Sequence, residues 1–502
     1  MHKTDKKLAI LLFILALIPR ILGINRDQVH RDEQVYVRYG YQYIVNIIEL
    51  NFDRTYWMET YHNFEHPPLA KLLFGMAIFF SKDHIDPLIA ARLVVVIIGS
   101  LTVIVLFFFT KELYNRRFAL LSALFLSFQN THVFHSRLAM LDVPLAFFYL
   151  LTLFFFYKGL KGNGKYILIS AITLGLAIGT KYTGLLLIPT AISILLINYL
   201  KIKEIGEQKM LIFPTVTLTK FIFFLLWVPI GLLIVFLLPP FTWVGIYWLS
   251  DVFTELTKYW IGIVCLMVTI FILIYFISKK LRLTKLNNRN VIQLPSISLR
   301  KAFLIILCMA ICGAVLAFII NTALPNIIYV FSRPFAYHIS HTQRGHTVLF
   351  FGRQVIPPWY FYIVVLILAL TPYMLGFIIF GSYNSLRRRQ YEDRFIWCWI
   401  INVLVLSSFS TVKFGPRFIL QVFPCLMILG ALGIEQILEL RNHIAARNRM
   451  LWVGCIFVCL DILFLGITFP YYFEYFSEFF GVSIGHEPFV RGLIRDDVPA
   501  SF

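Results

Sequence analysis

The chain is organised by apolar runs that recur along its length, each long enough to cross a bilayer at about twenty residues per crossing. Short polar segments separate most of them. Such runs occur at 8–24, 90–110, 118–136, 143–157, 166–180, 182–200, 221–239, 260–278, 302–321, 359–380, 395–411, 418–438 and 450–470. The pattern predicts an all-α, polytopic membrane protein with about thirteen transmembrane helices.

Long polar segments interrupt this pattern on one predicted side, the outer one. They are 25–89, 240–259 and 321–359, and by parity the tail 471–502 lies on the same side. We expect residues 1–470 to form a single transmembrane domain and the tail to be a short extension. Because the other loops are mostly short and basic, function is expected on the outer side.

The first outer segment opens with two adjacent carboxylates, Asp32 and Glu33. A helical face follows, which predicts a helix lying in the membrane interface; its members are Val37, Tyr41, Ile44 and Ile48. If they have no catalytic role, the two carboxylates would act as the N-cap residue and as an acidic residue in the first turn of this helix.

A second helix is predicted after Glu65-His66-Pro67-Pro68. The proline pair forces the residues just before it into an extended conformation and favours the start of a helix just after it. The apolar run 69–80 is too short to cross a bilayer, so we expect a juxtamembrane or re-entrant helix. Alternatively, His66 and the prolines form a rigid turn that has no catalytic or binding role.

Composition supports the membrane class, since 59% of residues are hydrophobic and only 14% are charged. These values exclude a soluble multidomain enzyme and a disordered scaffold. The first run has a basic flank but no cleavage site, so it is expected to be a retained helix.

The net charge of +19 follows from orientation. The excess lies in segments predicted to be cytoplasmic, notably Lys279, Lys280, Arg282, Lys285 and 387–389. A cytoplasmic N-terminus and anionic membrane lipids explain this charge, and no nucleic-acid partner is expected.

No metal is expected. All seven cysteines fall inside apolar runs, without the spacing of a zinc site or of a disulfide framework. His338, His341 and His346 also fit no standard site, and the first outer segment has no Asp-x-Asp motif.

Further charged residues are predicted at the outer ends of the spans: Lys71, Arg92, Arg137, Asp142, Lys181 and Arg417. Each alone would be a snorkelling or capping residue. Together with Asp32 and Glu33 they predict an outer pocket of carboxylates and fixed cations. Such a pocket can deprotonate a nucleophile and stabilise a departing phosphate.

In order and spacing, four motifs resemble the protein O-mannosyltransferase family and its prokaryotic relatives, which include the aminoarabinose transferase that modifies lipid A. The motifs are Asp32-Glu33, 65–69, 136–142 and 179–181. The resemblance covers residues 1–190 and continues weakly to residue 440 through 352–360 and 416–418. It implies a C-type glycosyltransferase fold that takes a sugar from a polyprenyl-phosphate carrier on the non-cytoplasmic face.

The resemblance also implies roles for residues. Asp32 matches the proposed catalytic base, Glu33 its neighbour, and Asp142 a second acidic position near the acceptor. The expected substrate-binding residues are Glu65, His66, Lys71, Arg92, Arg137, Lys181 and Arg417. Phe418 stands where many relatives have tyrosine, and no inserted sugar-binding repeat domain is expected, so the acceptor class stays open.

Our first hypothesis is therefore an inverting transferase that moves mannose or another hexose from a polyprenyl- or dolichyl-phosphate carrier to a protein or lipid hydroxyl, with no cofactor. The membrane would be the plasma membrane of a prokaryote or the endoplasmic reticulum of a eukaryote. A lipid-linked sugar transporter or flippase is the alternative from another class, and a polymerase or ligase of surface glycans is a third.

Overall fold

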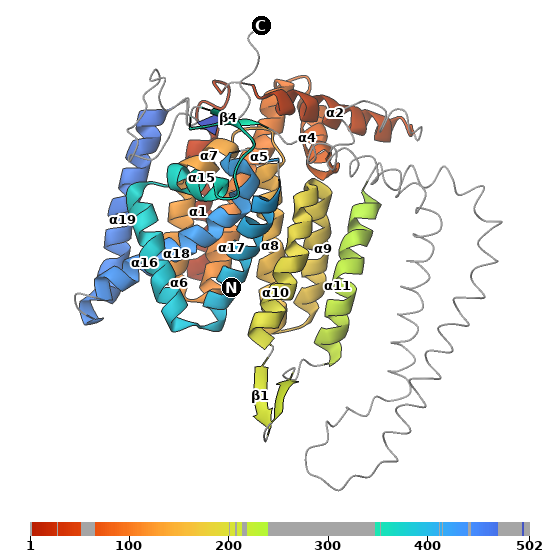
Figure 1. The fold of residues 1–502 in the computed structure, drawn as a ribbon. Helices are drawn as coiled ribbons and strands as arrows, with labels where there is room; N and C mark the ends of the chain where they lie inside the picture. The colour runs from red at the N-terminus through yellow and green to blue at the C-terminus, as the bar shows by residue number, and fades with distance from the viewer. Residues whose placement is uncertain are drawn as a thin grey trace, which may run out of the picture.

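The computed structural model describes most of the chain as upright helices with two helices laid across one end (Figure 1). The residues it describes are 3–27, 29–51, 66–199, 201–205, 208–212, 218–238, 347–351, 353–410, 412–413, 415–439, 443–469 and 494–495. The upright helices are α1 (Lys3–Ile21), α5 (Pro87–Leu113), α6 (Arg116–Phe128), α8 (Asp142–Lys161), α9 (Lys165–Thr180), α10 (Leu187–Tyr199), α11 (Leu218–Leu237), α16 (Pro372–Arg388), α17 (Tyr391–Phe409), α18 (Phe423–Glu439) and α19 (His443–Thr468). The short helices are α7 (Asn130–His135), α15 (Phe361–Ala369) and the 3₁₀ helices η1 (Tyr182–Leu186) and η2 (Pro416–Val422).

The helices agree with most of the predicted spans, but several spans are divided. The run 118–136 is split into α6 and α7 at Gln129, and the run 359–380 is split into α15 and α16 at Leu370–Thr371. The runs 182–200 and 418–438 each begin with a 3₁₀ turn. The runs 260–278 and 302–321 lie outside the described residues, so the count of about thirteen is not confirmed.

In the described part of the chain, four helices are long and apolar enough to cross a membrane: Pro87–Leu113, Asp142–Lys161, Pro416–Leu438 and Arg449–Thr468. Shorter apolar helices stand beside them, such as Lys165–Thr180. Large apolar side chains on α1 and α19, among them Ile10, Ile14 and Leu463, are exposed as expected for a surface in contact with lipid. The chain is an integral membrane protein.

The two helices laid across one end are α2 (Arg31–Ile48) and α4 (Leu69–Ser81), and both juxtamembrane predictions are confirmed as helices (Figure 1). We call this end of the molecule the site end. The buried face of α2 carries Tyr36, Gly40, Tyr43 and Ile44, whereas Ile48 is exposed. Of the predicted apolar face, Ile44 is therefore buried by the packing of α2 on α4, whereas Ile48 stays exposed at the end of the helix.

Two small sheets depart from the all-α prediction. Strands β1 (Lys201–Ile205) and β2 (Gln208–Ile212) form an antiparallel hairpin after α10. Strand β3 (Val348–Phe350) pairs antiparallel with both β4 (Arg353–Val355) and β5 (Ile494–Arg495), which gives the order β4-β3-β5. The fold is predominantly helical.

Ion pairs join the helices at the end opposite the site end, which we call the basic end. Asp5 of α1 is buried and pairs with Lys111 at 2.6 Å and with Arg116 at 2.9 Å. Lys161 pairs with Glu392 at 2.9 Å and connects α8 to α17. Asp393 is almost fully buried and pairs with Arg388 at 2.6 Å.

Candidate active site

The start of α2 places two neighbouring carboxylates in different surroundings. Successive residues of a helix point about 100° apart. When one carboxylate faces the core, the next therefore faces away from it. The side chain of Glu33 is fully buried, whereas that of Asp32 is 39% exposed. Of this pair, only Asp32 is open to a substrate.

Glu33 and Arg92 form a buried ion pair that joins α2 to α5. Arg92 donates from Nε and Nη2 to the two carboxylate oxygens of Glu33, each at 2.8 Å. Its Nη1 donates to the carbonyl oxygens of Ile24 at 2.8 Å and Asp27 at 3.3 Å. Glu33 also accepts from the backbone N–H groups of His30 and Ala139. These contacts favour a structural role for Glu33 and Arg92.

Arg137 has similar surroundings. It is fully buried, donates from Nε to Asp27 Oδ2 at 2.9 Å and donates from Nη1 to the carbonyl oxygens of Pro19 and Leu22 at the end of α1. Burial raises the pKa of Asp27, and the charge of Arg137 opposes this rise. Arg137 thus caps the end of α1 and pairs with the carboxylate of Asp27. These contacts indicate a structural role for Arg137 rather than a role in substrate binding.

Asp32 faces a cation from a distant part of the chain. Arg417, at the start of η2, donates from Nη1 to Asp32 Oδ2 at 3.3 Å. His30 caps α2 by accepting from the backbone N–H of Asp32 at 3.1 Å, and its Nδ1 lies 3.8 Å from Asp32 Oδ2. The structure therefore brings Asp32 and Arg417 together at one end of the bundle.

Lys181 and Asp142 form a second pair beside the first. Lys181 Nζ donates to Asp142 Oδ1 at 2.6 Å, and both side chains are nearly buried. The ring of Phe418 lies 4.2 Å from Lys181 Nζ and 5.4 Å from the guanidinium carbon of Arg417. Phe418 therefore joins the two pairs through cation–π contacts.

The second motif lies near the start of α4. His66 is partly buried and its ring centroid is 6.0 Å from that of Tyr36. Lys71 is 1% exposed, with Nζ 5.4 Å from the centroid of the Tyr43 ring. Both residues pack against α2. Glu65 lies outside the described residues.

Two residues of the site, His30 and His135, were not selected from the sequence, and Lys413 lies close to Arg417 in the chain. His30 precedes Asp32 by two positions and is visible as a cap only in the structure. His135 is buried within the electrostatic reach of Asp142, Arg417 and Lys181. Lys413 donates to the carbonyl oxygens of Pro357 and Pro358, and burial lowers the pKa of its amine. The Asp-Glu pair that follows His30 was the available signal for this residue, whereas the isolated His135 gave none.

The arrangement suits proton transfer beside an anion. Asp32 can accept a proton, and Arg417 and Lys181 can stabilise negative charge on a phosphate. Among the described residues, no group of three histidine, cysteine or acidic side chains could hold a metal ion. His338, His341 and His346 fall outside those residues. The four cysteines in the described ranges, Cys398, Cys425, Cys455 and Cys459, are free.

Comparison with known proteins finds a family match that overlaps the predicted region of resemblance from residue 65 onward and does not include Asp32 and Glu33. Residues 65–227 match the family described as dolichyl-phosphate-mannose-protein mannosyltransferase. Dolichyl-phosphate-mannose–protein mannosyltransferase 1 of Saccharomyces cerevisiae is 30% identical over 256 residues, which are 46% of this chain and 29% of the yeast protein. The chain thus matches less than a third of the length of this relative.

Solved structures are also similar. The archaeal oligosaccharyltransferase AglB of Archaeoglobus fulgidus, in complex with an inhibitory peptide and a dolichol-phosphate, is 15% identical over 92% of this chain and 54% of its own, with a TM-score of 0.47. ArnT of Cupriavidus metallidurans, bound to undecaprenyl phosphate, is 15% identical over 93% of this chain and 71% of its own, with a TM-score of 0.45. The S. cerevisiae protein O-mannosyltransferase complex bound to the sugar donor is 23% identical over 47% of this chain and 33% of its own, with a TM-score of 0.37. The family match and the yeast relative confirm the resemblance of this chain to the protein O-mannosyltransferase family.

Proposed function

We propose that the chain is a membrane glycosyltransferase of the C-type fold, which moves mannose or another hexose from a polyprenyl- or dolichyl-phosphate carrier to a hydroxyl group of a protein or lipid. The observation that carries this proposal is the placement of Asp32. It is an exposed carboxylate at the site end, in contact with Arg417 and next to the pair of Lys181 and Asp142.

In the proposed reaction, Asp32 accepts the proton of the acceptor hydroxyl while the oxygen attacks the anomeric carbon. The bond between that carbon and the phosphate oxygen breaks, and the lipid phosphate leaves from the opposite face with the electron pair. The configuration at the anomeric carbon is therefore inverted. Arg417 and Lys181 stabilise the charge that develops on the phosphate.

We place the site on the non-cytoplasmic face. The sequence predicts an excess of lysine and arginine in the cytoplasmic segments, and such residues are enriched on the cytoplasmic side of membrane proteins. Lys111, Arg116, Lys158 and Lys161 lie at the basic end, as does the start of α1. The site end then faces the outside, where a lipid carrier and a protein or lipid acceptor can meet.

The test is transfer by the purified protein in lipid vesicles. Polyprenyl-phosphate hexoses labelled in the sugar are supplied with serine- and threonine-containing peptides or with lipid acceptors, and the labelled product is identified. Asp32→Asn keeps the shape of the side chain and removes the base, so transfer should fall by about 10²- to 10⁴-fold. Asp83→Asn is the matched control, because Asp83 is an exposed carboxylate in the turn between α4 and α5.

Near wild-type turnover by Asp32→Asn would contradict the assignment of the base. Movement of the labelled donor across the vesicle membrane, without any labelled product, would contradict a transferase and favour the lipid-linked sugar transporter. Because no metal is expected, transfer should persist in excess EDTA, and full loss with recovery on adding a divalent cation would contradict that expectation.

A further inference from the structure

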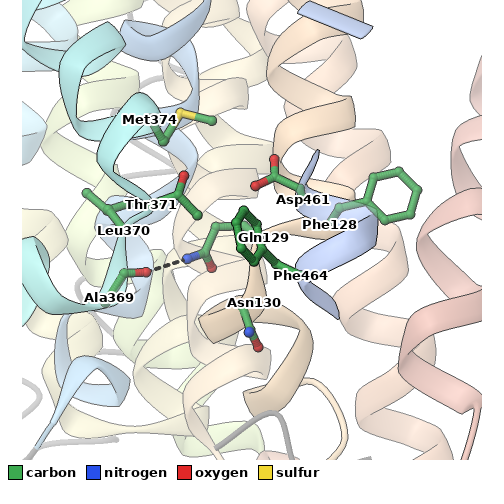
Figure 2. Close-up of a pocket in the computed structure, with 9 residues that line it drawn as sticks. All are labelled: Phe128, Gln129, Asn130, Ala369, Leu370, Thr371, Met374, Asp461 and Phe464. Atoms are coloured by element: carbon green, nitrogen blue, oxygen red, sulfur yellow. Dashed lines mark hydrogen bonds between the residues drawn. The ribbon is translucent and has the colours of Figure 1, made fainter. Parts of the chain in front are cut away.

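A small polar pocket, which shares no lining residue with the candidate active site, lies where two interrupted helices meet α19 (Figure 2). One wall is the break between α6 and α7, a second is the break between α15 and α16, and the third is α19. Its lining residues are Phe128, Gln129, Asn130, Ala369, Leu370, Thr371, Met374, Asp461 and Phe464.

Hydrogen bonds join the break between α6 and α7 to the break between α15 and α16. Gln129 has extended backbone angles, and its side chain donates to the carbonyl oxygen of Ala369 at 3.0 Å. Thr131 donates to the same oxygen at 3.3 Å. Two donors therefore occupy the carbonyl of Ala369 at the end of α15, and the pocket is a fixed part of the fold.

Two buried polar side chains at the pocket have no protein partner. Thr371 is the N-cap residue of α16, but its hydroxyl makes no capping hydrogen bond and Oγ1 is buried without a partner. Asn130 is 6% exposed, and both polar atoms of its amide are buried without a partner. Leaving such a group unbonded costs about 1–3 kcal/mol. Native proteins usually satisfy these groups with an ordered water.

Asp461 adds an acceptor on the opposite wall. It is 6% exposed, and its Oδ1 accepts a hydrogen bond from the hydroxyl of Tyr373. Figure 2 shows Thr371 and Asp461 on opposite sides of the pocket, with Gln129 between and below them. The cavity measures about 10 Å³, and a single water needs about 10–15 Å³ on this scale.

We propose that this pocket is a binding site for one ordered water molecule, hydrogen-bonded to Thr371 and Asp461, which face each other across it (Figure 2). Water fits the site because it can donate to the carboxylate of Asp461 and also accept from the hydroxyl of Thr371. A metal cation fits less well, since it needs several oxygen ligands and the carbonyl of Ala369 is already occupied by two donors. The bound water joins the start of α16 to α19.

Replacing threonine by valine tests the proposal through stability. Thr371→Val in the full-length protein should lower the Tm by about 1–3 °C, because the water loses a partner. Thr110→Val is the matched control: the hydroxyl of Thr110 is also buried without a partner, but Thr110 does not line the pocket. Removing a hydroxyl that has no water partner should leave the Tm unchanged or raise it.

Hydroxyl-radical footprinting by X-ray radiolysis tests the water directly, since radicals formed from a bound water oxidise the side chain beside it. Met374 lines the pocket and Met427 of α18 does not, although both are buried. We expect faster oxidation of Met374 than of Met427, and loss of this difference in Thr371→Val. Equal, slow oxidation of both methionines would overturn the proposal, as would a Tm of Thr371→Val that matches Thr110→Val. A Tm that rises with sodium but not with choline at equal ionic strength would also overturn it, in favour of an ion.

Discussion

At the residue scale, burial separates the roles of two carboxylates that are adjacent in the sequence. Glu33 is bonded to Arg92, His30 and Ala139 and has no exposed surface. The carboxylate of Asp32 lies 3.3 Å from Arg417 and 3.8 Å from His30, and its side chain is 39% exposed. The Asp-Glu pair therefore combines a candidate base with an anchor that holds the base in place.

Arg92→Ala should destabilise the fold, because it leaves the buried charge of Glu33 without its partner. Breaking such a pair costs about 3–5 kcal/mol. Arg92→Lys should restore only part of the loss, since one ammonium cannot replace the two parallel hydrogen bonds. The measurements are Tm and donor affinity on the same variants. An unchanged Tm with weakened donor binding would show instead that Arg92 binds the phosphate.

Arg417→Ala should act on transfer more than on stability, because Arg417 contacts Asp32 at the open part of the site. We expect a loss of about 10²- to 10³-fold in transfer, the effect of removing one electrostatic donor. Arg26→Ala is a control, since Arg26 is exposed at the same end of the molecule. If Arg417→Ala and Arg26→Ala transfer sugar equally well, Arg417 does not stabilise the leaving phosphate.

At the element scale, the position of Asp32 depends on how closely α2 approaches α4. A Cβ atom on Gly75 would meet the backbone of Gly40, and a Cβ atom on Gly40 would meet the carbonyl oxygen of Lys71. Both glycines are therefore required by the close approach of the two backbones. The crossing fixes the orientation of α2, and with it the direction in which Asp32 points.

Gly75→Val should push α2 away from α4, lowering both the Tm and the transfer rate. Gly376→Ala is the matched control within α16, because no atom lies within 4 Å of the added Cβ. It should be neutral or stabilising by about 0.5–1 kcal/mol, the helical preference for alanine over glycine. Equal Tm values for Gly75→Val and Gly376→Ala would contradict the close crossing.

At the scale of the whole molecule, the charged residues divide the bundle into two ends. The basic end carries ion pairs between helices, such as Lys161 with Glu392. The site end carries buried pairs around the open carboxylate of Asp32. Both ends thus carry ion pairs, and the proposed orientation depends on the excess of lysine and arginine in the segments predicted to be cytoplasmic.

Cysteine reporters at Asp83 and Asn163 test this orientation in a variant without native cysteines. Asp83 lies in the turn between α4 and α5 at the site end, and Asn163 lies in the turn between α8 and α9 at the basic end. A membrane-impermeant thiol reagent should label Asp83→Cys from outside intact cells and Asn163→Cys only after permeabilisation. Labelling of both from the same side would contradict the scheme.

The sequence determined the features that depend on local pattern. Apolar runs predicted where α5, α8, α9 and α17 lie, because each helix must present apolar side chains along its whole length to lipid or to the core. The Pro-Pro motif before Leu69 predicted the start of α4, since proline favours the first turn of a helix. The family resemblance selected Asp32 and the cations around it.

Only the tertiary structure decided which charges pair with each other. Arg92 and Glu33 are 59 positions apart, and Arg417 and Asp32 are 385 apart. Periodicity places each residue on its own helix, but it gives neither the crossing of α2 over α4 nor the breaks at Gln129 and Thr371. Those depend on contacts between distant segments, including the hydrogen bond from Gln129 to Ala369. The sequence around an ionisable residue looks the same whether that residue is a catalytic group or a structural anchor. The two roles differ in burial and in bonding partners, and only the packed structure sets these.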